Sequence, residues 1–204
     1  MAGKRAANLL SLAVLSFLRE RPMHPYEMST LMRERGLSYS IKLNFGSLYA
    51  TIAGLLVQGR IDIRNTEREG NLPERTVYTI TPLGLEELQT SITDILKAPA
   101  KEYPRFTAGL TMLGHLAPEQ VMELLGQRLD ALRALIAKDT KIRADALAQG
   151  VEEVFLLEVE YSLALYQAEL AWLQALIPRI SGTFARPADG VLRWKFLTEE
   201  QNHE

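Results

Sequence analysis

Apolar residues in the first sixty positions recur every three or four residues, which is typical of helices with one buried face. Gly36 and Gly59 follow two of these periodic segments, at positions where glycine commonly ends a helix. Pro25 suits the first position of the second helix, and Asn44 is a good N-cap for the third. The three predicted helices cover residues 6–21, 25–35 and 44–58.

After Gly59 the period of the pattern changes from helical spacing to alternation. Residues 61–64 alternate apolar and polar side chains, and residues 76–80 form a β-branched and aromatic run. The polar stretch between them contains Gly70 and Pro73 and is typical of a turn. Residues 61–81 are therefore predicted to form a two-stranded hairpin with a half-buried first strand.

After the hairpin, the spacing of apolar residues predicts only helices. Thr81-Pro82 is an N-cap followed by a first-turn proline, and the helix that it opens places one apolar face at Leu85, Leu88, Ile92, Ile95 and Leu96. Beyond a linker at residues 98–100, one long helix begins at Pro118, with its inward face predicted at Val121, Leu124, Leu125, Leu132, Leu135 and Ile136. Another covers residues 151–177 and is expected to end at Pro178.

The fold class is thus mostly α: an N-terminal winged helix-turn-helix of the α+β type, residues 1–97, followed by an all-helical domain, residues 101–198. The segment 151–177 has two apolar faces, one running through Val154, Leu157, Tyr161, Leu165 and Ala168 and the other through Leu156, Val159, Leu163, Tyr166 and Leu170. A helix that is apolar on both sides is usually covered on both. We therefore expect a homodimer through the C-terminal helices.

Composition narrows the class of protein further. The chain contains no cysteine, which excludes disulfides and thiolate metal sites and agrees with a cytoplasmic protein. Lys4 and Arg5 precede an apolar run as in a signal peptide, but no small-residue cleavage site follows, and the run is too short to span a bilayer. We interpret it as a buried first helix and expect no membrane association.

Charge is distributed unevenly between the two predicted domains. The net charge is −2, yet residues 1–80 carry eleven Lys and Arg against seven Asp and Glu, whereas the remainder carries twelve against eighteen. A basic N-terminal domain beside an acidic one indicates a polyanionic partner at the N-terminal end.

Three segments of the first domain resemble motifs of the PadR family of transcriptional regulators. Residues 45–52 read FGSLYATI, residues 24–28 read HPYEM, and residues 75–84 read RTVYTITPLG. They are similar to the family's third helix, the start of its second helix and the exit of its wing. Two positions depart from the pattern: Ala50 stands where the family has proline, and Ala53-Gly54 stands where it has Arg-Leu.

The resemblance implies that the helix 44–58 enters the DNA major groove, with the hairpin 61–81 as a wing on the neighbouring backbone or minor groove. Ser47 and Thr51 can hydrogen-bond bases or phosphates, and Ala50 can meet a thymine methyl group. The amides behind Asn44 favour a phosphate. The full set of candidate DNA-binding residues is Tyr26, Lys42, Asn44, Ser47, Tyr49, Ala50, Thr51, Arg64, Arg68 and Arg75.

Each assignment has a structural alternative. Ser47 and Thr51 could be ordinary solvated helix positions, and the only role of the wing arginines could be to keep the hairpin soluble. Tyr49 continues the apolar stripe and could pack in the core, whereas in the family the matching tyrosine can reach the DNA backbone. Trp172 and Trp194 are candidates for an effector pocket, with core or interface packing as the alternative.

No pattern of catalytic or cofactor-binding residues is present. The three histidines, His24, His115 and His203, lack partners at metal-ligand spacing, and no glycine-rich phosphate loop or nucleophile motif occurs. We therefore expect that the protein is not an enzyme and that it binds no metal and no cofactor. The sequence predicts a dimeric repressor that binds a pseudo-palindromic operator in double-stranded DNA, with a small molecule as candidate effector. The alternative is a helical interaction module whose winged helix binds protein rather than DNA.

Overall fold

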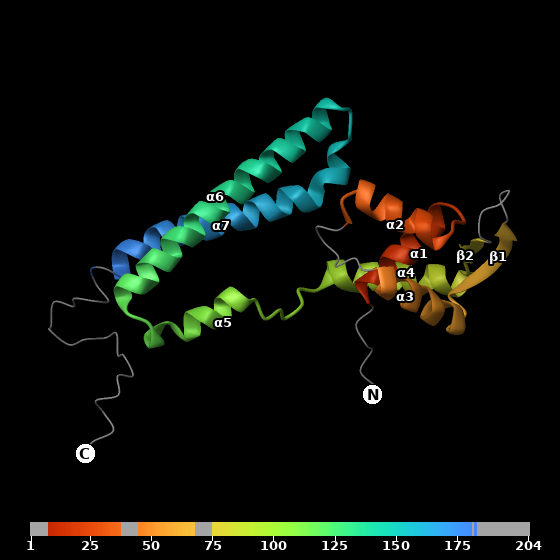
Figure 1. The fold of residues 1–204 in the computed structure, drawn as a ribbon, viewed down its shortest axis with the longest axis horizontal. Helices are drawn as coiled ribbons and strands as arrows, with labels where there is room; N and C mark the ends of the chain where they lie inside the picture. Colours follow the sequence, from red (N-terminus) through yellow and green to blue (C-terminus); the bar gives the residue numbers. More distant parts are fainter. Residues whose placement is uncertain (1–7, 38–44, 68–74, 181, 183–204) are drawn as a thin grey trace, which may run out of the picture. The chain divides into compact units, whose positions relative to one another are not determined.

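The computed structural model describes residues 8–37, 45–67, 75–180 and 182, and divides the chain into two compact units, Met1–Lys101 and Glu102–Glu204. Figure 1 shows the elements of both units. Unit 1 contains α1 (Leu9–Glu20), α2 (Pro25–Glu34), α3 (Phe45–Val57), β1 (Ile61–Glu67), β2 (Arg75–Ile80) and α4 (Pro82–Lys97). Unit 2 contains α5 (Arg105–Thr111), α6 (Pro118–Ala148), α7 (Leu157–Arg179) and two 3₁₀ turns, Leu113–His115 and Glu153–Leu156. The architecture confirms the predicted winged helix followed by an all-helical region.

Side-chain caps fix where three helices of unit 1 begin. Asn8 has an extended backbone and its side chain accepts a hydrogen bond from the Leu10 amide, so α1 begins at Leu9. The predicted start at residue 6 was therefore wrong, because Asn8 offers a cap that interrupts the helix. His24 Nδ1 accepts from the Glu27 amide at 3.1 Å, and Thr81 Oγ1 accepts from the Gly84 amide at 3.1 Å. Each side chain satisfies an amide that the first turn leaves without a backbone partner.

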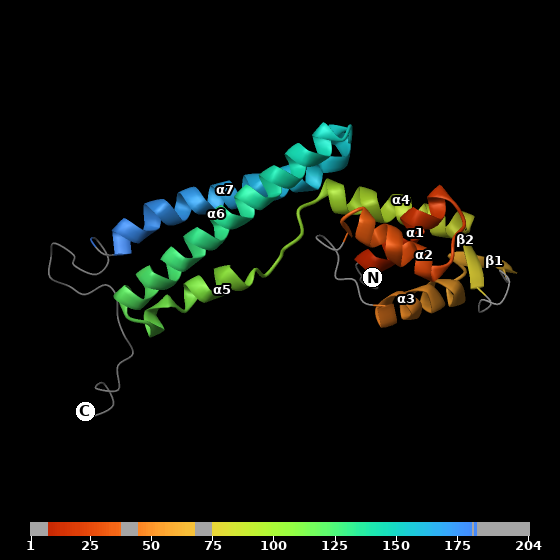
Figure 2. The ribbon, with the colours of Figure 1, turned by 45° about the horizontal axis from the view of Figure 1, so that its top comes forward.

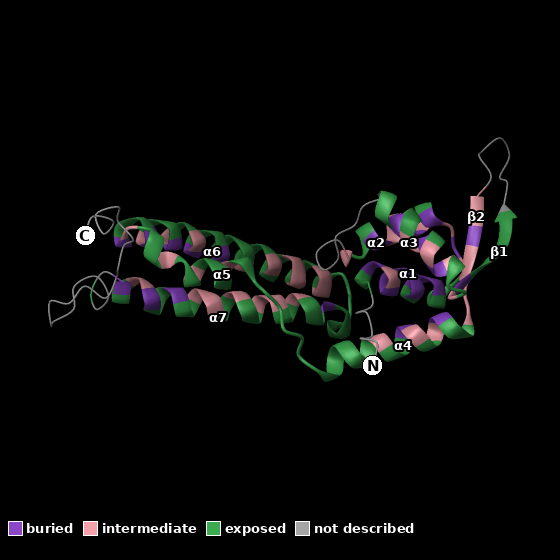
Figure 3. Cartoon of the chain, turned by 90° about the horizontal axis from the view of Figure 1, so that it is seen from below, coloured by how far each residue is buried: buried purple, intermediate pink, exposed green. Residues whose placement is uncertain are grey.

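The core of unit 1 is built around α1. Seven of its twelve residues are buried, and it packs against α3, α4 and β2. Met28 and Met32 of α2, and Leu48, Ile52 and Leu55 of α3, complete the same cluster. Figure 3 shows this buried stripe along α1. An apolar first helix is thus the internal scaffold of the unit, as its sequence pattern predicts.

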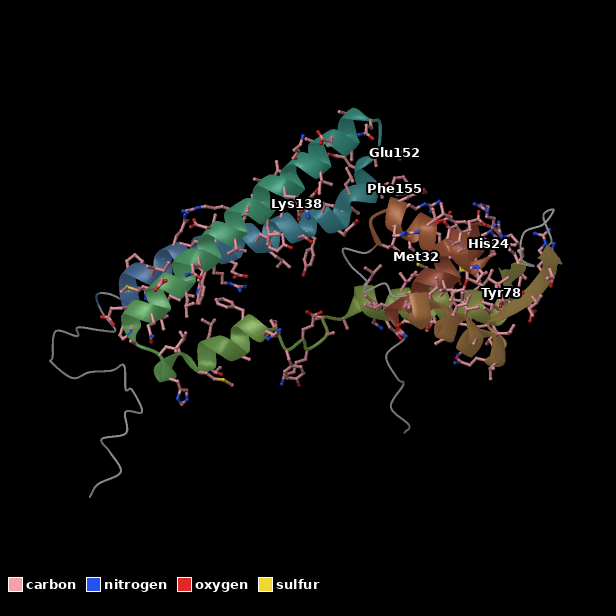
Figure 4. The ribbon with its side chains drawn as sticks, viewed as in Figure 1. His24, Met32, Tyr78, Lys138, Glu152 and Phe155 are labelled. Atoms are coloured by element: carbon pink, nitrogen blue, oxygen red, sulfur yellow. The ribbon has the colours of Figure 1, made fainter. Side chains whose placement is uncertain are left out.

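The hairpin is an antiparallel pair in which Ile61 lies opposite Ile80 and Glu67 opposite Arg75. Met23, which sequence reasoning missed, adds one bridge to this sheet: its amide donates to the Tyr78 carbonyl at 3.2 Å, and the Tyr78 amide donates back at 3.1 Å. Figure 4 labels Tyr78 on β2. This bridge anchors one strand of the wing to the segment between α1 and α2.

Burial in the hairpin is less regular than the alternating pattern predicts. Ile61 and Val77 are buried, but Ile63 is exposed. The expectation of a buried Ile63 was therefore wrong. Within the described chain β1 pairs only with β2.

The apolar face of α4 is covered only along its first half. Leu88 is buried, whereas Ile92, Ile95 and Leu96 are exposed, Leu96 at 81%. The prediction of a single inward face from Leu85 to Leu96 was therefore wrong for the last three positions. A helix of sixteen residues is about 24 Å long, and in the described part of unit 1 only its N-terminal half finds apolar neighbours.

Unit 2 is a pair of long helices, α6 and α7, that lie side by side in both views (Figures 1 and 2). Val121, Leu125, Leu129 and Leu132 of α6 form a cluster with three buried residues near the end of the chain's described part, Leu173, Leu176 and Ile180. Leu124 and Leu135, expected inward, are exposed. Leu124 directly precedes the buried Leu125, and Leu135 lies three positions beyond the buried Leu132, so both side chains are outside the cluster.

The boundaries of α7 differ from the predicted range 151–177. Gly150 adopts φ +84°, Glu152 is extended, and the 3₁₀ turn Glu153–Leu156 precedes the helix, which begins at Leu157. Figure 4 places Phe155 in this turn between α6 and α7. At the other end, α7 continues through Pro178 to Arg179. A proline so near a C-terminus removes only one backbone hydrogen bond, from a turn whose carbonyls are already partly unpaired.

The central role of α1 leads to a stability prediction. Leu15 is fully buried (0%), so Leu15→Ala removes apolar contacts and leaves a cavity. We expect it to lower the free energy of unfolding by about 2–5 kcal/mol. Leu9→Ala in the same helix, at 51% exposure, is the matched control and should cost less than about 1 kcal/mol. Chemical denaturation followed by circular dichroism measures both, and equal losses would contradict the assigned core.

Candidate nucleic-acid interface

The exposed face of α3 is small and uncharged. Leu48, Ile52 and Leu55 turn into the core, which leaves Gly46, Ser47, Ala50 and Ala53 exposed and Thr51 partly exposed. The whole helix, FGSLYATIAGLLV, contains no charged residue. Short side chains allow another surface to come close to the helix backbone, and the hydroxyl groups of Ser47 and Thr51 can donate or accept hydrogen bonds there.

Tyr49 belongs to this exposed face and not to the core. Its side chain is 53% exposed, although it continues the apolar stripe of the sequence. The core-packing alternative for Tyr49 was therefore wrong in this unit. The residue lies about a quarter turn away from Leu48 around the helix, far enough to leave the contact with α1. Its hydroxyl group is accessible to a partner.

A β-bulge in the wing distinguishes Arg64 from its neighbours. Ile63 pairs with Tyr78 and Asn65 pairs with Val77, so Arg64 is the extra residue between two paired positions. Bulges bend the strand and redirect the side chain of the inserted residue. Arg64 is exposed and has no ion pair within the described ranges. A guanidinium group so placed is suited to an anionic partner.

The other wing and helix candidates differ in how they are held. Arg75 is partly buried and lies opposite Glu67 in the strand register, so it is less available than Arg64. Tyr26, in the first turn of α2, is exposed and stacks beside His24 with ring centroids 6.4 Å apart. Three further candidates lie outside the described residues: Lys42, Asn44 and Arg68.

Two basic residues of unit 1 are used to hold elements together. Arg35 pairs with Glu20 at 2.6 Å and lies over the Phe17 ring, which joins α2 to α1. The hydrogen bond that Arg35 donates to the Glu20 carboxylate raises the pKa of Arg35 above its ordinary value. Arg60, directly before β1, forms an ion pair with Glu87 of α4. Sequence reasoning missed both pairs, because their partners are fifteen and twenty-seven positions away.

Trp172 lies in an aromatic and charged cluster of unit 2. Its ring contacts Phe106 of α5 edge-on at 6.3 Å, and the Arg128 guanidinium lies 3.7 Å from the Phe106 ring centroid. Arg128 also pairs with Glu169. These contacts join α5, α6 and α7. Trp194, the second effector candidate, lies outside the described residues.

One face of α7 lacks a cover in the described chain. It begins in the preceding turn and repeats with helical spacing through the exposed residues Val154, Leu157, Tyr161, Leu165 and Ala168. Tyr161 is 67% exposed. This set, which we call the α7 outer face, includes all five residues that the sequence assigned to one of its two apolar faces.

Metal and membrane sites find no support in the described part of the chain. No group of three or more histidine, aspartate or glutamate side chains there could hold a metal ion. None of the described helices combines the length and the hydropathy that crossing a bilayer requires.

Comparison with known proteins identifies the class to which the first unit belongs. Residues 14–90 match the model of the transcriptional regulator PadR-like family. The chain therefore carries a PadR-like transcriptional-regulator domain, as its motifs predict. Members of this family are transcriptional regulators, which agrees with the expectation that the protein is not an enzyme. None of the curated protein sequences matches the chain significantly.

Several solved structures share the fold over most of the chain. Bacillus subtilis PadR in complex with operator DNA matches with a TM-score of 0.69 and 19% identity, over 84% of this chain and 99% of that one. The same protein in complex with p-coumaric acid matches with a TM-score of 0.70 and 17% identity, over 85% and 99%. The Vibrio cholerae virulence activator AphA matches with a TM-score of 0.64 and 19% identity, over 85% and 99%. The likeness therefore extends through the helical region.

Proposed function

We propose that this protein is a homodimeric, cytoplasmic DNA-binding regulator of the PadR type that represses transcription from a pseudo-palindromic operator. In this proposal α3 enters the major groove and the β1–β2 hairpin contacts the neighbouring backbone. The observation that carries it is the exposed face of α3, which belongs to the same PadR-like domain as a wing with an exposed, bulged arginine. A fold neighbour, Bacillus subtilis PadR, is known in complex with operator DNA.

The exposed side chains suit the proposed contacts. Ser47 and Thr51 provide hydrogen bonds to bases or phosphates, and Ala50 provides a methyl surface for thymine. Arg64 and the Tyr49 hydroxyl contact phosphates, which fix the register of the protein on DNA without reading sequence. The proposal retains the other candidates of the sequence, namely Tyr26, Lys42, Asn44, Arg68 and Arg75.

The α7 outer face supports the dimer. Val154, Leu157, Tyr161 and Leu165 are each more than half exposed within one chain. A contiguous apolar surface of this kind marks an interface. A second copy of the chain is the occupant that we propose, because two recognition helices related by a two-fold axis would match a pseudo-palindrome.

Release from DNA by a small molecule is the regulatory part of the proposal. A fold neighbour binds p-coumaric acid, and the cluster of Phe106, Arg128 and Trp172 joins all three helices of unit 2. A ligand beside Trp172 that prefers one arrangement of these helices would shift the equilibrium toward it. Repression follows where a bound dimer covers a promoter.

One observation favours a second function, a winged helix that binds protein. The exposed end of α3 includes Val57 at 89% exposure, and the helix contains no lysine or arginine. Major-groove helices commonly read guanine with arginine or lysine. DNA binding itself distinguishes the two functions.

Thr51→Glu tests the DNA-binding function. The variant would place a carboxylate against the groove, so we expect an unchanged circular dichroism spectrum and a loss of about 100-fold or more in affinity. The measurement is fluorescence anisotropy on a duplex selected from a random library by the wild-type protein. Affinity for that duplex should also fall steeply with salt.

Thr93→Glu makes the same substitution on an exposed position of α4 and is the matched control. It should change affinity by less than about threefold, because a remote rim charge acts mainly through screened long-range electrostatics. Selection of no duplex by the wild-type protein would favour the protein-binding alternative. Unchanged affinity of a natively folded Thr51→Glu would contradict the role of α3.

Leu165→Glu tests the dimer. A charge in the centre of the α7 outer face would be desolvated on association, so we expect the wild-type mass by light scattering to be twice the 22.9 kDa of the chain and the variant to be a monomer. Gln167→Glu adds the same charge to an exposed flank of α7 and should remain a dimer. A wild-type monomer, or a dimeric Leu165→Glu, would show that this face is not the interface.

A further inference from the structure

The start of the wing is bonded to the first turn of α4. The Thr81 amide donates to the Arg60 carbonyl at 3.1 Å, and the Thr81 hydroxyl donates to the Gly59 carbonyl at 2.8 Å. The same hydroxyl oxygen accepts from the Gly84 amide and caps α4. One threonine thus holds both the beginning of β1 and the beginning of α4. We call this contact between Gly59-Arg60 and residues 81–87 the wing base.

Gly84 sets how closely the two segments approach. A Cβ atom at this position would lie 2.1 Å from the Arg60 carbonyl oxygen, far inside van der Waals contact. The obstructing atom belongs to the backbone, so it cannot move aside as a flexible side chain does. Gly84 is required here for space rather than for a positive φ, since the positive-φ glycines in the described ranges are Gly36, Gly59 and Gly150.

An ion pair joins the same two segments. Arg60 Nε donates to Glu87 Oε2, and the two side chains are 26% and 23% exposed. Arg60 is also bonded to the Gln58 carbonyl, at 3.4 Å. The guanidinium group is therefore held by Glu87 and the Gln58 carbonyl, and Arg60 is not a free cation of the wing.

The wing base lies at a distance from the exposed arginine of the hairpin. Arg64 is four residues further along β1, which at about 3.3 Å per residue places it about 13 Å from Arg60. Over that length, a tilt of about 10° at the base would move Arg64 by about 2 Å. A hydrogen bond tolerates only a few tenths of an ångström. The orientation of the wing base therefore decides whether Arg64 can reach a phosphate.

We propose that Glu87 and Gly84 of α4 are positioning residues for DNA binding: they fix the wing base so that Arg64 contacts the phosphate backbone. The inference rests on the proposed function. It gives these two residues of α4 an effect on DNA binding although they do not contact the DNA. It also predicts that Glu87, an acidic residue, raises affinity for a polyanion, the opposite of what its charge alone would do.

A double-mutant cycle on the full-length protein tests the proposal. Glu87→Gln keeps the side-chain shape and removes the ion pair, and Arg64→Ala removes the contact that the wing base positions. We expect each single variant to bind the selected duplex about tenfold more weakly and each to lower the slope of log affinity against log salt by about one. The double variant should be no weaker than Arg64→Ala, because the two changes remove the same contact.

Glu86→Gln is the matched control, since it removes the same charge from a neighbouring exposed position. It should bind at least as tightly as the wild type. If the Gly84→Ala variant folds, it should lose as much DNA affinity as Glu87→Gln does. If it does not fold, Glu87→Gln alone tests the proposal. Additive losses in the cycle, or equal affinities for Glu87→Gln and Glu86→Gln, would overturn the proposal. A wild-type protein that selects no duplex would instead contradict the proposed function itself.

Discussion

The burial of α1 is the interaction on which the N-terminal unit depends. This helix is the common packing partner of α3, α4 and β2, so it fixes the candidate recognition helix, the second strand of the wing and the helix that follows the wing. Because α3 gives Leu48, Ile52 and Leu55 to the core, its exposed face between residues 46 and 53 consists of short, uncharged residues and one tyrosine. The chemistry of the exposed face is therefore a consequence of how the core is filled.

The wing is held differently, by backbone bonds and one ion pair at its ends rather than by apolar burial. Met23 bridges to Tyr78 on one strand, and the contact of Arg60 with Thr81, Gly84 and Glu87 holds the other. Beyond these points Ile63 and Arg64 extend away from the core and are exposed. Polar contacts are directional, so they fix the orientation of a hairpin that has little core of its own.

The spacing of apolar residues predicted which elements form, because a helix or strand that is buried on one side needs apolar residues at a regular interval. It succeeded for α1, α3 and the hairpin, and it found the two apolar faces of α7, of which one is exposed in a single chain. It failed where the partner was not local in sequence. The exposed half of α4, the Arg60–Glu87 pair and the bridge at Met23 depend on residues that no repeat connects. Motif resemblance supplied the PadR-like class, but it did not reveal the bulge at Arg64, which appears only in the strand register.

In the proposed function, two winged helices joined by their helical units read one operator together. Hydroxyl-radical footprinting of the wild-type protein on a duplex that it selects tests this most directly. A dimer of this kind should give two protected patches related by a two-fold axis, with centres about 34 Å or a multiple of that distance apart along the DNA. A saturated complex with a single protected patch would contradict it.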